Sequence, residues 1–180
     1  QAFRDYALDN LGHDEDDASQ FRVMTLVAID DPGLFLRGYH RDVTGATEAE
    51  VLSLRAHITA VCDLEVWNPP KTKIGLALEH SLAREPKSQT TFGVVGLEPG
   101  KIHIATMKSE PSPDLDIADA TDYGRLHREI LRGIFGSSRE LNVVGVKNSA
   151  DQAIGDALNG VSEFGFVMRP ISTEMAESVI

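Results

Sequence analysis

The chain has 180 residues, of which 42% are hydrophobic and 25% are charged, as is typical of a folded globular domain. Its 28 acidic residues outnumber its 17 basic ones, and the net charge of −11 excludes a general binder of nucleic acid or of anionic membranes, since both would be repelled. No apolar run reaches the ~18 residues of a transmembrane helix, and the single cysteine, Cys62, excludes an internal disulfide and a cysteine-based zinc site. We therefore expect a cytoplasmic protein.

Both ends of the chain have the pattern of helices. Residues 1–8 place apolar side chains on one helical face with no capping residue before them, and residues 172–180 begin another helix. Because the sequence starts with Gln1 rather than methionine, we expect it to be part of a longer protein.

The first strands are expected in a hairpin. Residues 21–29 are almost continuously apolar and rich in β-branched side chains, which predicts a strand buried on both faces. The Asp-Asp-Pro-Gly sequence at 30–33 predicts a turn, and residues 34–43 return as the second strand. The acidic stretch at 13–19 lacks the spacing and central glycine of an EF-hand, which favours a solvated loop over a calcium site.

The middle of the chain alternates helices and strands. Thr47 and Glu50 fit a capping box at the start of a helix with Val51, Leu54 and Ile58 on one face. The elements expected after it are a strand at 59–67, a helix at 74–84 and two strands of a hairpin at 91–96 and 101–107.

The turn of that hairpin has the outline of a phosphate loop. It reads Gly-Leu-Glu-Pro-Gly-Lys at 96–101, with one residue too few between the glycines. Ile102 stands where a magnesium-binding serine or threonine belongs. The segment is therefore interpreted as a Pro-Gly turn.

Residues 109–121, rich in proline and aspartate, are the best linker or lobe boundary. The elements expected beyond it are an amphipathic helix at 122–135, a strand at 141–146, a helix from Ser149 to Leu158 and a strand at 163–168. The β-α-β order suggests a right-handed crossover between parallel strands.

These elements predict an α+β fold, with a mixed sheet, antiparallel hairpins and a C-terminal β-α-β-α segment. Residues 1–110 would supply a helix, the hairpins and two helices on the sheet. Residues 122–180 would add an α-β-α-β-α segment packed on the same sheet, as one domain or as two lobes.

The six histidines and the cysteine show no local catalytic or metal-binding pattern. No two histidines have His-x₃-His or His-Glu-x-x-His spacing, so the sequence supports no metal site. Cys62 falls on the apolar side of a predicted strand, where a thiol stays protonated. His57 and His80 are expected at the surface, and His127 at the boundary of its helix.

The best candidate site is a basic cluster at the end of the strand predicted at 34–43. Two-residue alternation places Arg37 and Arg41 on one face and His40 on the other. Arginine forks suit a phosphate or carboxylate, and a histidine can carry a proton near neutral pH. We predict that Arg37, His40 and Arg41 bind an anionic ligand at the mouth of a cleft. The alternative is an edge strand whose arginines pair with structural carboxylates.

Three stretches follow one another in an order typical of a known family. They are residues 23–34 with His40 and Arg41 shortly after, residues 91–96, and residues 126–136. Together they resemble the carboxy-terminal portion of an uncharacterised bacterial and archaeal family, the domain of unknown function 1015. The family has Pro-Thr where this chain has Gly38-Tyr39, and its Gly-His-His-Arg-Tyr signature is absent from this chain.

That signature belongs to an upstream part which resembles the ParB and sulfiredoxin-like fold, a fold that includes a free-serine kinase. The resemblance therefore implies nucleotide or phosphate chemistry in the full-length protein.

Two functions stay open from the sequence. In the first, this chain is a non-catalytic or site-completing part of a protein that processes a small phosphorylated ligand or a nucleotide. In the second, it is a dimerisation or protein-interaction module, with a homodimer as the expected form and no catalytic role. The catalytic residues, the cofactor and whether the full-length protein is an enzyme are left undecided.

Overall fold

The computed structural model describes residues 38–112 and 114–170. Contacts divide the chain into the units Gln1–Phe35 and Leu36–Ile180, and the described residues belong to the second. The strand predicted at 21–29 with its hairpin, the acidic stretch, both terminal helices and Arg37 lie outside the described residues.

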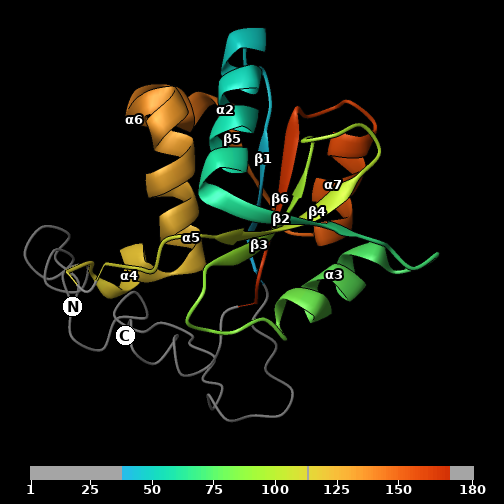
Figure 1. The fold of residues 1–180 in the computed structure, drawn as a ribbon. Helices are drawn as coiled ribbons and strands as arrows, with labels where there is room; N and C mark the ends of the chain where they lie inside the picture. The colour runs from blue at the N-terminus through green and yellow to red at the C-terminus, as the bar shows by residue number, and fades with distance from the viewer. Residues whose placement is uncertain (1–37, 113, 171–180) are drawn as a thin grey trace, which may run out of the picture. The chain divides into compact units, whose positions relative to one another are not determined.

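The described strands form one six-stranded sheet (Figure 1). They are β1 (His40–Val43), β2 (Cys62–Trp67), β3 (Thr91–Val95), β4 (Ile102–Met107), β5 (Val144–Lys147) and β6 (Phe164–Met168). Their order across the sheet is β2-β4-β3-β6-β1-β5, and each neighbouring pair is antiparallel. The first of these strands in the sequence therefore lies between the last two.

This topology confirms the α+β class and the hairpin of β3 and β4. Strands β5 and β6 do run parallel to each other, because both are antiparallel to β1. They are not hydrogen-bonded to each other, since β1 occupies the position between them. The described sheet is therefore antiparallel throughout rather than mixed.

Helices cover both faces of the sheet (Figure 1). They are α2 (Glu48–Val61), α3 (Ile74–Leu82), α4 (Ile117–Ala120), α5 (Asp122–Arg125), the π-helix η2 (Leu126–Leu131), α6 (Arg132–Val143) and α7 (Ala150–Leu158). Strand alternation separates two apolar cores: Phe92 and Phe166 pack with α2, η2 and α6, whereas Val95 and Val167 pack with α3 and α7. None of the helices in the described part is long and apolar enough to cross a membrane.

The start of α2 confirms the capping box. The amide of Glu50 donates to the Thr47 hydroxyl over 3.3 Å, and the amide of Thr47 donates to the Glu50 carboxylate over 2.7 Å. The helix continues to Val61, so the strand expected from residue 59 begins at Cys62.

The helix predicted at 122–135 ends at Gly136, whose backbone is not helical, with φ +68° and ψ 160°. A second helical segment follows within α6 and continues to Val143, so the strand expected from residue 141 begins at Val144. Glu140 and Val143, which are both buried, lie on this second segment.

The π-helix η2 joins α5 to α6. Its wide turn displaces the usual backbone pairing, and the carbonyl oxygen of Glu129 lies 2.8 Å from Nε2 of His57 on α2. His57 is half-buried rather than at the surface, and this contact holds α2 against η2.

Candidate functional site

The structure separates the two described members of the basic cluster predicted from the sequence. His40 projects into the layer of α3 and α7, where its Nδ1 accepts the Met168 amide over 3.1 Å. Its Nε2 therefore holds the proton and lies 3.3 Å from Oε1 of Glu79. His40 ties β1 to β6 and α3, while Arg41 projects to the opposite face of the sheet.

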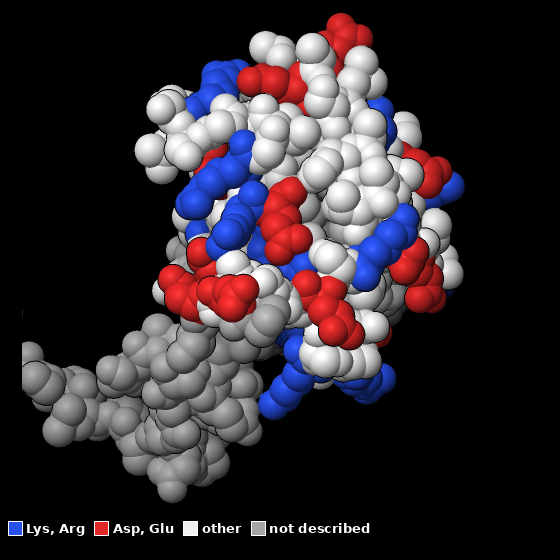
Figure 2. Space-filling model, turned by 60° about the vertical axis from the view of Figure 1, so that its left-hand side comes forward, with Lys and Arg blue, Asp and Glu red and all other residues white. Residues whose placement is uncertain are grey.

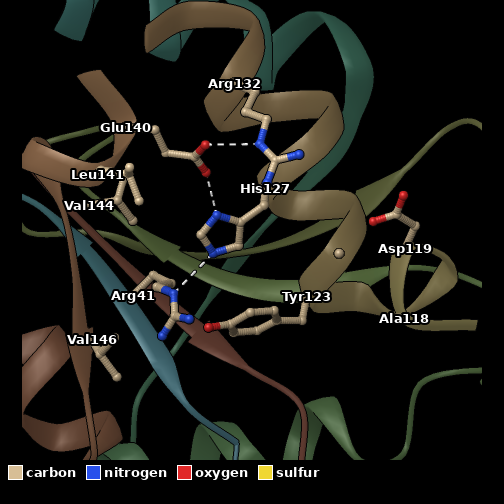
Figure 3. A pocket seen from close by; sticks show the side chains of 11 residues that line it. Arg41, Ala118, Asp119, Tyr123, His127, Arg132, Glu140, Leu141, Val144 and Val146 are labelled. Atoms are coloured by element: carbon tan, nitrogen blue, oxygen red, sulfur yellow. Dashed lines mark hydrogen bonds and ion pairs between the residues drawn. The ribbon is translucent and has the colours of Figure 1, made fainter. Parts of the chain in front are cut away.

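Arg41 lines a pocket of about 470 Å³. The other lining residues are Ala118, Asp119, Tyr123, Gly124, His127, Arg132, Glu140, Leu141, Val144 and Val146. They come from β1, from the segment α4 to η2 and from α6 and β5, and β1 lies far from the others in the sequence (Figure 3).

The Arg41 guanidinium is stacked and only partly hydrogen-bonded. Its central carbon lies 4.2 Å from the centroid of the Tyr123 ring. Its Nε donates to Nε2 of His127 over 3.0 Å, and Nη1 donates to the His40 carbonyl over 3.3 Å. The residue is only 9% exposed, and within the described residues Nη2 has no hydrogen-bond partner. This nitrogen is not among the fully buried atoms that lack a partner, so it is open to the pocket.

His127 links Arg41 to a buried carboxylate. Because the Nε–H of arginine can only donate, the Nε2 of His127 must be the unprotonated nitrogen, and its Nδ1 donates to Oε1 of Glu140. Burial lowers the pKa of His127. The carboxylate of Glu140 opposes this lowering, and the charge of Arg41 adds to it. The imidazole is therefore neutral at neutral pH.

Glu140 has its own counter-ion. Its second oxygen accepts a hydrogen bond from Nε of Arg132 over 3.1 Å. Asp119, on the other side of the pocket, is paired with Arg128 over 3.0 Å. With these two carboxylates bound to other arginines, Arg41 is left without a carboxylate hydrogen-bonded to its own guanidinium among the described residues.

On the face that Figure 2 presents, basic side chains are spread among acidic ones. The basic ones form no continuous patch there. Such a surface does not suit a polyanion, whereas a single recessed guanidinium suits a small anion.

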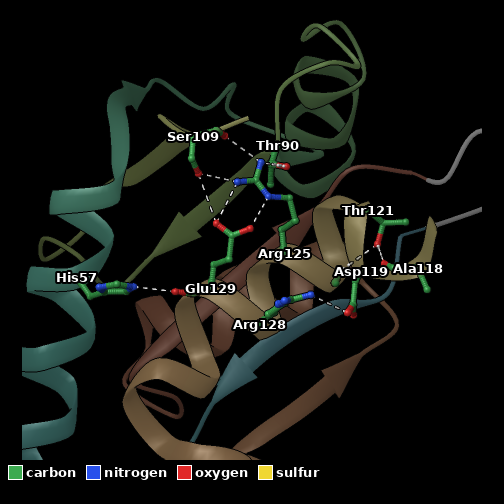
Figure 4. Close-up of polar contacts among 10 residues, drawn as sticks. His57, Thr90, Ser109, Ala118, Asp119, Thr121, Arg125, Arg128 and Glu129 are labelled. Atoms are coloured by element: carbon green, nitrogen blue, oxygen red, sulfur yellow. Dashed lines mark hydrogen bonds and ion pairs between the residues drawn. The ribbon is translucent and has the colours of Figure 1, made fainter. Parts of the chain in front are cut away.

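A second buried arginine holds the α5–η2 segment in place (Figure 4). Arg125 donates through Nε and Nη2 to the carboxylate of Glu129, through Nη1 to the Thr90 hydroxyl and the Ser109 carbonyl, and through Nη2 to the Ser109 hydroxyl. All of its N–H groups are thereby used. It anchors the segment that carries Tyr123 and His127.

Sequence reasoning found Arg41 but not its neighbours. The sequence places Tyr123 and His127 four residues apart in the helix predicted at 122–135, and their ring centroids are 4.9 Å apart in the structure. That spacing was the available signal. Glu140 gave none, because the sequence predicted that the helix ends before it.

No family model, curated protein or solved structure matches this chain. The resemblance to the domain of unknown function 1015 family therefore stays a prediction. The part of the chain that the structure describes also contains no group of three acidic, histidine or cysteine side chains placed to hold a metal ion.

Proposed function

We propose that this domain binds a small anionic ligand, a phosphate ester in the first place, and that Arg41 receives its head group. One observation carries the proposal: a guanidinium buried to 9% exposure lines a pocket with Nη2 unpaired among the described residues. A buried charge is costly unless it is paired, so such a group gains from an incoming anion.

The residues around Arg41 do not complete its coordination. His127 and Tyr123 are neutral partners. Glu140 is engaged by His127 and Arg132, and Asp42 lies on the other face of β1, 3.3 Å from the Lys147 ammonium. Burial lowers the pKa of Arg41, opposed by Asp42 and Glu140, but a guanidinium stays charged at neutral pH.

The proposal is for binding rather than for acid–base catalysis. The Nε2 of His127 is the nitrogen that would accept a proton from a substrate, and it already accepts the Nε–H of Arg41. The pocket thus favours a ligand-binding or site-completing role, in agreement with the phosphorylated ligand that the sequence suggests.

Titration of the 180-residue chain with inorganic phosphate, followed by NMR or calorimetry, tests the proposal. Arg41→Met keeps the apolar stem and removes the guanidinium, so phosphate affinity should fall by about 10- to 100-fold. Arg55→Met is the matched control, since Arg55 is a half-buried arginine that donates to the Gly96 carbonyl outside the pocket.

Both variants lower the net charge equally, so a non-specific electrostatic effect would weaken binding in both. Equal phosphate affinity in the wild type and in folded Arg41→Met contradicts the proposal.

A further inference from the structure

The pocket is larger than an anionic head group requires. A volume of about 470 Å³ falls in the range of sites that enclose a whole small molecule. A phosphate held at Arg41 would leave most of this space to the remainder of the ligand.

The wall beside Arg41 is apolar. It consists of Leu141, Val144 and Val146, at the end of α6 and on β5 (Figure 3). Val146 is the cross-strand partner of Arg41 in the β1–β5 ladder, so the two side chains project side by side from one face of the sheet. The apolar wall therefore begins next to the guanidinium.

This wall is also unusually open. Leu141 is 85% exposed and Val146 is 57% exposed. One exposed aliphatic residue is ordinary, but two at the lip of the same pocket, next to an incompletely paired cation, form an amphipathic surface.

From this arrangement we infer that the ligand is an amphipathic phosphate monoester, with its phosphate on Arg41 and an aromatic or branched aliphatic body against Leu141, Val144 and Val146. The inference rests on the proposed function and adds the chemical class of the organic group that is attached to the phosphate. Aliphatic side chains offer no hydrogen bonds, so a sugar body would lose water there without compensation, whereas an apolar body gains from burial.

Three ligands with the same head group separate the contributions: inorganic phosphate, phenyl phosphate and ribose 5-phosphate. Phenyl phosphate should bind about tenfold more tightly than inorganic phosphate, as burial of one ring face predicts. Ribose 5-phosphate should bind no more tightly than inorganic phosphate. Calorimetric or NMR titration of the wild-type chain measures all three.

A pair of variants then locates the apolar contact. Leu141→Ser should remove most of the tenfold preference for phenyl phosphate and leave the affinity for inorganic phosphate unchanged. Leu52→Ser is the matched control, because Leu52 on α2 is 55% exposed and does not line the pocket. It should leave both affinities unchanged.

The outcomes distinguish the two proposals. If phenyl phosphate binds no more tightly than inorganic phosphate, the inference fails and the anion site stands. If none of the three ligands binds, the proposed function fails with it. A ligand-free dimer that Leu141→Ser dissociates, with phenyl phosphate affinity unaltered, would show that a second copy of the chain covers the lip and would also overturn the inference.

Discussion

Two arginines on the same side of the sheet are buried to nearly the same extent but differ in how many of their N–H groups form hydrogen bonds. Arg125 is fully buried and Arg41 is 9% exposed. Arg125 uses every N–H group on Glu129, Thr90 and Ser109 (Figure 4). Arg41 donates Nε to a neutral imidazole and leaves Nη2 in a pocket. The number of unused donors, more than the depth of burial, separates the anchor from the candidate ligand-binding group.

The charges around the two arginines make the same distinction. Arg125 faces the carboxylate of Glu129 at 2.7 Å, which cancels its charge within the fold. Arg41 has two carboxylates in its neighbourhood, Glu140 and Asp42, and each is bound to other residues. An arginine whose charge is paired within the fold gains little from binding an anion, whereas an arginine without a paired carboxylate is stabilised by one.

Removing the anchor should have the largest effect on stability. Arg125→Met leaves Glu129, Thr90 and Ser109 without their shared donor, and we expect the free energy of unfolding to fall by about 3 kcal/mol. Urea denaturation measures this loss. If Arg125→Met is as stable as the wild type, Arg125 is not a structural anchor and the distinction between the two arginines is wrong.

Removing the candidate ligand-binding arginine should cost much less. Arg41→Met retains the packing of the side-chain stem and loses one well-formed hydrogen bond, to His127, so we expect a loss of about 1 kcal/mol in the absence of ligand. The same urea experiment measures it. A loss as large as that of Arg125→Met would identify Arg41 as a second structural anchor.

The contacts of His127, beside Arg41, and of Glu129, beside Arg125, should make the stability of the fold depend on pH in two different ranges. Burial lowers the pKa of His127, so the unfolded chain takes up this proton first, and the stability that the neutral imidazole contributes is lost as pH falls below about 6.5 towards the lowered value. Hydrogen bonds from Arg125 lower the pKa of Glu129, so its contribution is present above about 4.3 and is lost as pH falls through the lowered value.

His127→Gln isolates the first range, because glutamine keeps a donor and an acceptor but does not titrate. Between pH 8 and pH 5.5, the stability of the wild type relative to this variant should decrease. An increase instead would mean that His127 is protonated and forms an ion pair with Glu140.

The sequence predicted those parts of the fold that local chemistry determines. The capping box at Thr47 and the Pro-Gly turn between β3 and β4 are short-range devices, and both elements formed where expected. The alternation that assigned Arg41 and His40 to opposite faces of β1 is equally local, and the structure has it.

The candidate site depended on contacts that no local pattern encodes. His127 lies on η2 and Glu140 on the helical segment that follows the kink at Gly136, so their contact depends on the direction that the chain takes at this kink. Arg41 reaches them only through the insertion of β1 between β5 and β6. Each is a tertiary outcome, so the sequence could identify a basic residue of interest and not the pocket around it.

The position of β1 also determines when the pocket can exist during synthesis. This strand leaves the ribosome before the other described strands, yet its partners are the last two, and the bond from the Met168 amide to His40 spans 128 residues. Closing so long a loop is slow and cannot begin until β6 has been made. Strands β2, β3 and β4 can already pair with one another in the nascent chain. Strand β1, which carries Arg41, has no partner until β5 and β6 have been synthesised.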